Sequence, residues 1–209
     1  QTIHTCVNQK NYNIYNNKKI ENNNELIFCH LGAISTRYDI DKVFWFIKEV
    51  NKFIKSKLII INQNEKNFIL KKIIKNNIDS SLVEIISLEF DQVPKFLENI
   101  DFGIFFPKKG FYLKGYFPTK FAEFIASRKP IITYNINNDF DNLFIKYSSG
   151  IILNRGIKQI SKIQYDNLIN FKYSNTFNEK SFSLIKNHLS VDVGIKKYFY
   201  IYKKMLNNA

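Results

Sequence analysis

Six short apolar runs rich in β-branched residues recur along the chain, and they constrain its fold more than any other feature. The runs are LIFCHL (26–31), KLIIIN (57–62), LVEIIS (82–87), DFGIFF (101–106), PIITY (130–134) and GIILN (150–154). Most of each run is apolar at consecutive positions, which is typical of strands covered on both faces of a sheet. We therefore expect a parallel sheet whose strands are joined by helices.

The segments between these runs have the spacing of amphipathic helices. One predicted face carries Val43, Phe46, Ile47, Val50 and Ile54, at positions i, i+3, i+4, i+7 and i+11. The alternation of about six strands with helices predicts an α/β fold, a Rossmann-like doubly wound parallel sheet that binds its ligand at the carboxyl ends of the strands. After Asn154 only helical patterns follow, and we expect these C-terminal helices to pack beside the sheet.

Composition narrows the class of protein. The chain has 209 residues, 45% of them hydrophobic, which is enough for a core of its own. No apolar run approaches the ~18 residues of a membrane helix, and the first residues do not resemble a secretion signal. Cys6 and Cys29 are the only cysteines, so neither a disulfide framework nor a zinc site is indicated, and a reducing cytoplasm fits. Because the chain opens on Gln1 and a polar, linker-like stretch, we expect it to be part of a longer protein.

The formal net charge of +13 favours anionic partners, which include nucleotide phosphates, nucleic acid and acidic membrane surfaces. Among the 31 basic residues only Arg37, Arg128 and Arg155 are arginines, and the lysines are scattered among Asn and Ile. A dedicated polyanion surface favours clustered arginines, so we interpret the charge mainly as compositional drift.

The segment FPTKFAEFIASRKPIITY (117–134) concentrates residues that suit an anion site. Pro118 fits the first turn of a helix, and Phe117 before it offers no side-chain cap, so free N–H groups and Lys120 could bind an anion together. Glu123 lies three residues further on the same helix face, where its carboxylate could accept hydrogen bonds from two vicinal hydroxyls, as on a ribose. The alternative is an ordinary amphipathic helix with a solvated Lys–Glu pair on its surface.

Three loops follow predicted strands and should face one crevice, namely 32–39, 107–117 and 134–139. Arg37 in the first loop is either a phosphate ligand or a solvated residue. Phe90, just after the third apolar run, either stacks on a base or belongs to the core. His30 ends the first run without a nucleophile beside it, and we interpret it as structural.

Two Asp-x-Asp triplets, at 39–41 and 139–141, could in principle hold a metal ion. Both start predicted helices, where an Asp side chain caps free N–H groups and favours the positive end of the helix dipole. We interpret them as caps and predict no metal site.

Taken together, the chain from Leu26 to Leu153 resembles the C-terminal, nucleotide-sugar-binding domain of GT-B glycosyltransferases, specifically the family 4 enzymes that build surface polysaccharides. The resemblance rests on the order and spacing of several motifs rather than on one of them. These are HLGAISTRYDIDKV from position 30, D-x-G-I at 101–104, P-T-K-x-x-E-x-x-A-x-x-x-P-I-I at 118–132, N-x-x-x-D at 135–139 and G-I-I-L at 150–153.

The resemblance implies roles for matching residues. Glu123 matches the glutamate that binds the ribose hydroxyls of the nucleotide. The diphosphate would be held at the helix start and the first loop, by Gly32, Arg37, Pro118, Thr119 and Lys120. Contacts with the base or the sugar are expected from Phe90, Lys114 and Gly115. No catalytic residue is assigned, because the N-terminal domain, where relatives keep a catalytic histidine, is not in this chain.

The sequence departs from the family pattern at two places. Many relatives carry an acid eight residues before the ribose glutamate, and this position is Gly115 here. The glycine expected at the end of the same helix is also missing, since the chain has Arg128 and Lys129 before Pro130. Contacts with the donor sugar must then come from other residues, such as those of the loops 32–37 or 114–117.

The resemblance implies the donor half of a retaining hexosyltransferase that needs neither metal nor cofactor and moves a sugar from a UDP- or GDP-sugar to a glycan or lipid-linked acceptor. We expect an interdomain linker at 1–25, a nucleotide-sugar-binding domain at 26–155, and helices at 156–209 that pack on it and toward the absent N-terminal domain.

We expect a cytoplasmic protein, either free or peripheral on the inner face of the membrane. We expect no nucleic acid partner and no transferase activity of this chain alone. Two alternatives stay open: a basic α/β module that binds nucleotide or nucleic acid, and a sugar-nucleotide epimerase of the same fold.

Overall fold

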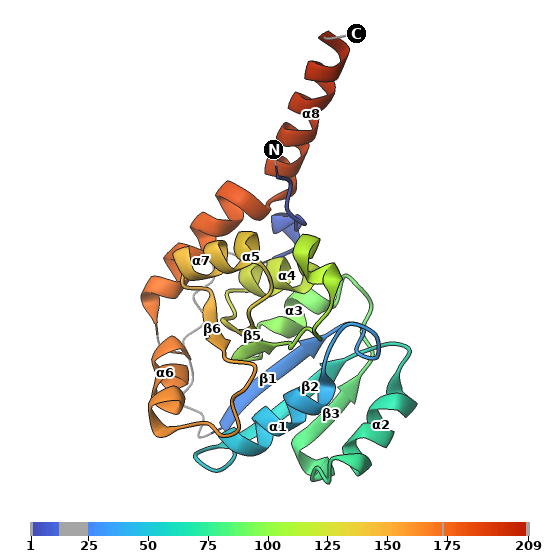
Figure 1. The fold of residues 1–209 in the computed structure, drawn as a ribbon, viewed down its shortest axis with the longest axis vertical. Helices are drawn as coiled ribbons and strands as arrows, with labels where there is room; N and C mark the ends of the chain where they lie inside the picture. Colours follow the sequence, from blue (N-terminus) through green and yellow to red (C-terminus); the bar gives the residue numbers. More distant parts are fainter. Residues whose placement is uncertain (1, 13–24, 173, 208–209) are drawn as a thin grey trace.

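The computed structural model describes residues 2–12, 25–172 and 174–207, and its centre is a six-stranded parallel sheet (Figure 1). In chain order the strands are β1 (Glu25–Leu31), β2 (Lys55–Ile61), β3 (Val83–Ile86), β4 (Phe102–Ile104), β5 (Ile131–Tyr134) and β6 (Gly150–Leu153). In space the order is β3-β2-β1-β4-β5-β6, which is the strand order of a Rossmann-type doubly wound sheet. The predicted α/β fold with six parallel strands is confirmed.

Helices cover both faces of the sheet, as the continuous apolar strands require. Those between the strands are α1 (Ile40–Val50), α2 (Lys66–Lys75), α3 (Val93–Leu97), α4 (Thr119–Ala126) and α5 (Asn138–Lys146). After β6 follow α6 (Lys162–Lys172), α7 (Asn175–Leu184) and α8 (Val191–Asn207). One core joins the sheet to α1, α2 and α6, and the other joins it to α3, α4, α5 and α7.

Four shorter helical segments complete the described chain. Three of them are turns of 3-10 helix, η1 (Gln9–Asn11), η2 (Ser80–Leu82) and η3 (Phe111–Gly115), and η4 (Ile185–Leu189) is a π-helical turn that continues α7. Among these, η3 lies in the connection between β4 and α4, directly before the segment singled out in the sequence.

The position of α4 depends on a glycine in β4. A Cβ placed on Gly103 would lie 2.5 Å from the ring of Phe124 in α4, a distance that no real contact allows. Because Gly103 has no side chain, α4 packs directly against the middle of the sheet. This close packing places the start of α4 at the carboxyl ends of the central strands.

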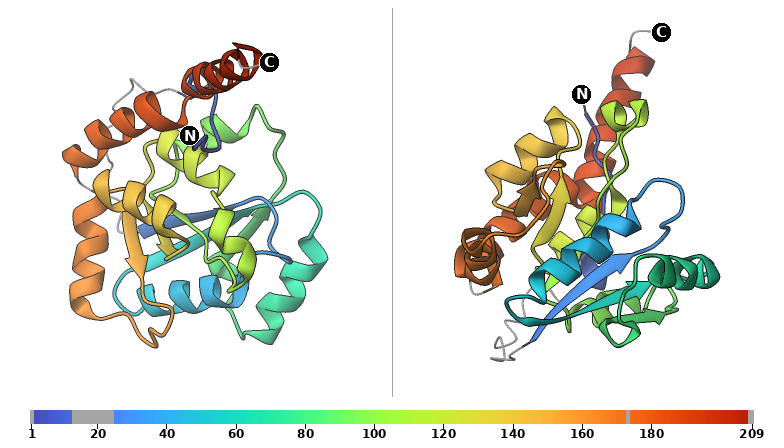
Figure 2. Two further views of the ribbon diagram at one scale, coloured as in Figure 1. Left: turned by 45° about the horizontal axis from the view of Figure 1, so that its top comes forward. Right: turned by 60° about the horizontal axis from the view of Figure 1, so that its bottom comes forward.

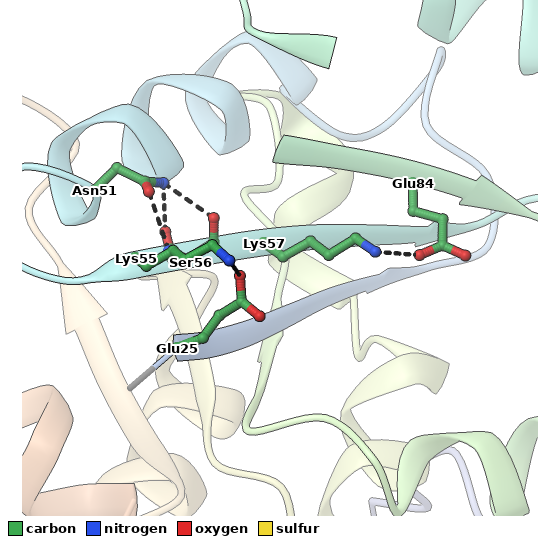
Figure 3. Close-up of polar contacts among 6 residues, drawn as sticks. All are labelled: Glu25, Asn51, Lys55, Ser56, Lys57 and Glu84. Atoms are coloured by element: carbon green, nitrogen blue, oxygen red, sulfur yellow. Dashed lines mark hydrogen bonds and ion pairs between the residues drawn. The ribbon is translucent and has the colours of Figure 1, made fainter. Parts of the chain in front are cut away.

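Polar contacts hold the strands in register toward their amino ends (Figure 3). Lys57 of β2 forms an ion pair with Glu84 of β3 at 2.5 Å, and Lys55 of β2 forms one with Glu25 of β1 at 3.4 Å. Asn51, just after α1, accepts a hydrogen bond from the backbone N–H of Ser56 at 3.0 Å. Exposed ion pairs of this kind contribute at most about 1 kcal/mol each, so we interpret them as aids to register.

The beginning of the chain lies beside the C-terminal helix. Val7 pairs with Ser190, and its N–H donates to the carbonyl of Leu189 at 2.7 Å. Cys6 packs against Gly194 of α8, where a Cβ would lie 2.7 Å from the cysteine sulfur. From this contact α8 projects away from the sheet, as Figures 1 and 2 show. The expected linker falls partly on residues 13–24, which lie outside the described residues.

None of the described helices is long and apolar enough to cross a membrane.

Candidate functional site

A pocket of about 450 Å³ opens at the carboxyl ends of β1 and β2, beside the start of α4. Its lining residues are Leu31, Gly32, Ala33, Ile61, Asn62, Gln63, Asn64, Glu65, Leu88, Phe90, Val93, Thr119, Lys120 and Glu123. The strand order reverses between β1 and β4, and α4 follows β4, so the pocket lies at the topological switch point of the sheet. Doubly wound sheets bind their ligands at this point.

The start of α4 forms one wall of the pocket. Pro118 is the N-cap residue with φ −67° and ψ 127°, and among the described residues no side chain caps the helix. The helix therefore begins at Thr119, one residue later than predicted, because Pro118 has extended rather than helical backbone. Pro118 has no N–H and does not line the pocket, whereas Thr119 and Lys120 do. The first N–H groups of α4 and the positive end of its dipole favour an anion here.

Lys120 is buried in this wall, with only 7% of its surface exposed. Its Nζ atom lies 3.2 Å from Nε2 of His30 and 3.6 Å from the ring centroid of Tyr38. Burial lowers the pKa of Lys120 to about 7, against the opposing effect of Glu123 and other negative groups nearby. The alternative of a solvated Lys–Glu pair is wrong, because the lysine is buried and the ion pairs between described residues do not include it.

Glu123 lines the same pocket one turn further along α4. Burial raises the pKa of this carboxyl, and the neighbouring Lys120 lowers it in part. The two residues are thus brought together as the helical spacing predicted, and both face the cavity. A half-buried carboxylate in such a wall can accept hydrogen bonds from the hydroxyl groups of a ligand.

The loop after β1 was expected to help hold the diphosphate, but several of its N–H groups are hydrogen-bonded within the protein. Glu65 accepts hydrogen bonds from the N–H of Ile34 at 2.7 Å and of Ser35 at 2.9 Å. The N–H of Gly32 donates to the carbonyl of Ile61 at 2.9 Å. These three amides already have partners inside the protein, so an anion depends more on Lys120 and the start of α4.

Glu65 and Asn62 are pocket residues that the sequence reasoning missed. The side-chain amide of Asn62 donates to the carboxylate of Glu65 at 2.8 Å. The side-chain oxygen of Asn62 accepts from the backbone N–H of Glu65 at 2.6 Å. Burial alone would raise the pKa of Glu65, but hydrogen bonds from Ser35, Ile34 and Asn62 together lower it. A signal was present in the sequence, since Asn62 and Glu65 have the spacing of a capping box directly after an apolar run.

Gly32 and Phe90 both line the pocket, as predicted. Gly32 has a φ of 82°, a left-handed conformation that favours glycine, and a Cβ placed there would meet no atom within 4 Å. Phe90 is 71% exposed, so the structure excludes a core role for it. Its ring is available to a flat group bound in the pocket.

Three other predicted site residues lie apart from the pocket lining in the described structure. Arg37 is exposed, 5.9 Å from the ring centroid of Tyr116. Lys114 is also exposed, and Gly115 is the last residue of η3. One contact of this region with the pocket wall is a hydrogen bond between the hydroxyls of Tyr116 and of Tyr38, whose ring lies against Lys120.

The two Asp-x-Asp triplets lie at the beginnings of α1 and α5. Asp39 caps α1 by accepting from the N–H of Lys42 at 3.2 Å, and Asp41 forms an ion pair with Lys72 at 2.7 Å. In α5 the capping residue is Asn137 rather than the predicted Asp139, because the helix begins at Asn138, two residues earlier than a cap at Asp139 implies. Within the described ranges, no three His, Cys, Asp or Glu side chains come together as a metal site.

Comparisons with known proteins bear on the fold. No family model and no curated protein matches this sequence. Among solved structures, a glycosyltransferase from Rickettsia africae ESF-5 aligns with all of the chain at a TM-score of 0.73 and 15% identity. AviGT4, a glycosyltransferase involved in avilamycin A biosynthesis, aligns with all of it at a TM-score of 0.70 and 14% identity. The chain has the fold of one half of a GT-B glycosyltransferase.

A third structure with this GT-B half is Anabaena Alr3699/HepE in complex with UDP-glucose, which aligns with 97% of the chain at a TM-score of 0.68 and 10% identity. In all three cases the chain spans less than two thirds of the other protein, namely 58%, 58% and 57% of its length.

Proposed function

We propose that this chain is the donor-binding half of a glycosyltransferase that transfers a hexose from a UDP- or GDP-sugar with retention of configuration. The observation that carries the proposal is the wall of the pocket formed by α4. There a buried lysine, an uncapped helix start and a carboxylate one turn away all face one cavity at the switch point of the sheet. The structure of Alr3699/HepE in complex with UDP-glucose, which shares this fold, supports a nucleotide-sugar as the ligand.

Each group of the pocket suits one part of such a donor. The N–H groups at the start of α4 and the Lys120 ammonium would bind the diphosphate, and Glu123 would accept hydrogen bonds from the ribose hydroxyls. Phe90 would lie against the base, and Gly32, with no side chain, would leave room for the ligand beside β1.

In this proposal the chain contributes to catalysis by stabilising charge. As the bond between the sugar and the diphosphate breaks, negative charge develops on the leaving phosphate, next to Lys120 and the start of α4. Groups held in place before the reaction stabilise that charge without reorganising. Lys120 and the start of α4 would stabilise the leaving diphosphate, as a metal ion does in metal-dependent enzymes. We therefore propose a reaction that needs neither a metal ion nor a cofactor.

The wider setting is part of the same proposal. The remaining half of the fold would bind a glycan or a lipid-linked acceptor in the synthesis of surface polysaccharide, as in the family 4 enzymes that the sequence resembles. We place the protein in the cytoplasm or on the inner face of the membrane, which the free thiols of Cys6 and Cys29 support.

Substitution of Glu123 tests the ribose assignment. We expect Glu123→Ala to weaken binding of UDP or GDP by about 1.5–3 kcal/mol, because a charged hydrogen-bond acceptor is lost. Binding of free pyrophosphate, which has no ribose, should change little. Calorimetry with both ligands measures the difference, after a thermal-shift screen of UDP, GDP, ADP and CMP has chosen the nucleotide.

The matched control is Glu179→Ala, at an exposed position of α7. It should leave both affinities unchanged. Equal losses for the nucleotide and for pyrophosphate in the Glu123→Ala protein would remove Glu123 from the ribose role.

A further inference from the structure

The contact between His30 and the carbonyl of Ile104 favours one direction for the hydrogen bond between Lys120 and His30. His30 is fully buried near the end of β1, and its Nδ1 lies 3.0 Å from the carbonyl oxygen of Ile104. A carbonyl oxygen can only accept, so Nδ1 carries the ring proton and Nε2 presents a lone pair. The Lys120 ammonium, 3.2 Å from Nε2, can only donate. Burial, with the lysine nearby, lowers the pKa of His30 well below 6.5 and keeps the ring neutral.

Two aromatic rings also lie close to the ammonium. The ring centroids of Tyr38 and Phe105 lie 3.6 and 5.9 Å from Nζ. An imidazole and two aromatic rings orient a cation but supply no counter-charge. Glu123 and Glu65 act on the ammonium from a distance, but the ion pairs between described residues do not include Lys120, and a buried charge without a paired counter-charge is costly. An anion in the pocket would supply it.

The titratable groups that face Lys120 come from each element packed around it. They are Cys29 and His30 of β1, Tyr38 of the following loop, Glu65 before α2, Tyr116 just after η3 through its bond to Tyr38, and Glu123 of α4. Of these, Glu65 and Glu123 are the carboxyl groups, and Glu65 is already held by Ile34, Ser35 and Asn62.

We propose that His30 is a positioning residue, whose Nε2 accepts a hydrogen bond from Lys120 and holds that ammonium at the pocket wall as the counter-ion of the bound anion. This inference rests on the proposed function and deepens it. It gives a role to a buried histidine that the sequence reasoning assigned to structure alone.

The arrangement couples binding to proton uptake. In the free protein the pKa of Lys120 is about 7, and a bound anion raises it because the charged form gains a partner. Above about pH 7 the lysine must therefore take up a proton as the anion binds. We expect the affinity for an anion to fall about tenfold from pH 6 to pH 8, because the protonated fraction of the free lysine falls by this factor.

Calorimetric titration with UDP-glucose tests the inference, since the diphosphate diester keeps a constant charge across this pH range. Titrations in pairs of buffers with different ionisation enthalpies count the protons that the protein takes up. The wild type should take up close to one proton per ligand at pH 8 and show the tenfold loss of affinity. Lys120→Met should take up none, and its affinity should be independent of pH.

Substitutions of His30 separate positioning from packing. His30→Phe keeps a ring but removes the acceptor, so affinity at pH 7 should fall about tenfold and the midpoint of the pH profile should move to lower pH. In His30→Gln the carboxamide oxygen can accept in place of Nε2, and we expect affinity within about threefold of the wild type. Thermal melting shows which variants fold, and if neither does, absence of proton uptake by the wild type at pH 8 would still overturn the inference.

Sulfate, whose charge is also constant in this range, separates failure of the inference from failure of the proposed donor. If UDP-glucose does not bind but sulfate does, the donor assignment is wrong, and the same measurements with sulfate decide the role of His30. Binding without proton uptake at pH 8, or a His30→Phe profile identical to that of the wild type, would overturn the inference. Failure of both anions to bind at pH 6 would overturn the inference and the proposed function together.

Discussion

Burial of Lys120 works against folding at neutral pH, because its ammonium leaves water without gaining a carboxylate partner. Its pKa is lowered from 10.5 to about 7, so between these values the unfolded chain holds a proton that the folded chain has released. Stability from this group therefore rises with pH across the interval, and the full cost of the charged lysine is present below about pH 7. Such a cost is common where a residue is retained for binding.

We predict that Lys120→Met gains stability relative to the wild type, most of all at pH 6. The gain should shrink by up to about 1.4 kcal/mol per pH unit as the pH rises above 7. Urea unfolding of both proteins at several pH values measures it. The pH dependence is the test, because the variant also leaves Nε2 of His30 without a donor, at a cost of about 1–3 kcal/mol at every pH.

The control for this comparison is Lys109→Met, at an exposed position. The difference in the free energy of unfolding between Lys109→Met and the wild type should not depend on pH between 6 and 9. A Lys120→Met protein whose stability difference is equally flat would contradict the buried-cation interpretation.

At the scale of elements, the packing of α4 against β4 connects the core to the pocket. Gly103→Ala would place a methyl group 2.5 Å from the Phe124 ring, so α4 must move away from the sheet. We predict a loss of about 1–3 kcal/mol in the free energy of unfolding. Because Lys120 and Glu123 move with the helix, nucleotide affinity should fall as well. Chemical denaturation and calorimetry measure the two effects.

Gly115→Ala is the matched control, because a Cβ there would meet no atom within 4 Å. This variant should unfold like the wild type. If Gly103→Ala bound nucleotide as tightly as Gly115→Ala does, the position of α4 would not matter for the site.

At the scale of the whole molecule, α8 exposes a row of large apolar residues where it projects from the sheet (Figures 1 and 2). They include Ile195, Tyr198, Phe199, Tyr202 and Leu206. Contiguous apolar surface of this kind is typical of an interface. Since the chain spans 58% of the glycosyltransferase from Rickettsia africae, we propose that the other half of the fold covers this face.

We predict that the chain by itself binds nucleotide but does not transfer sugar. In the proposed function, transfer depends on groups from two halves that close around donor and acceptor, and this chain would supply the donor side. Incubation with UDP- and GDP-sugars and mixed glycan acceptors should give no turnover above the background of an identically prepared Glu123→Ala protein. Turnover above ~1 per second by the wild-type chain would contradict the need for a second half.

Local patterns in the sequence were enough to predict the layers of the fold and one wall of the pocket. Consecutive apolar residues predicted strands covered on both faces, because local hydrophobic periodicity reports burial directly. The spacing of Lys120 and Glu123 predicted that both lie on one helix face, because that relation depends only on helical geometry. Gly32 lies at the strand ends as predicted, because parallel strands bring their carboxyl ends to one edge, and the structure decides for Phe90 between the pocket and the core, which the sequence had left open.

The contacts of these residues, in contrast, follow from the packed fold. The partners of Lys120 and Glu65 lie far away in the chain, at His30 and at Ile34 and Ser35, so no local pattern contains them. Burial of Lys120 likewise depends on Tyr38 and on the close packing of α4, which a helical pattern does not report. Propensity and spacing act over a few residues, whereas desolvation and hydrogen bonding of a buried charge depend on every element packed around it.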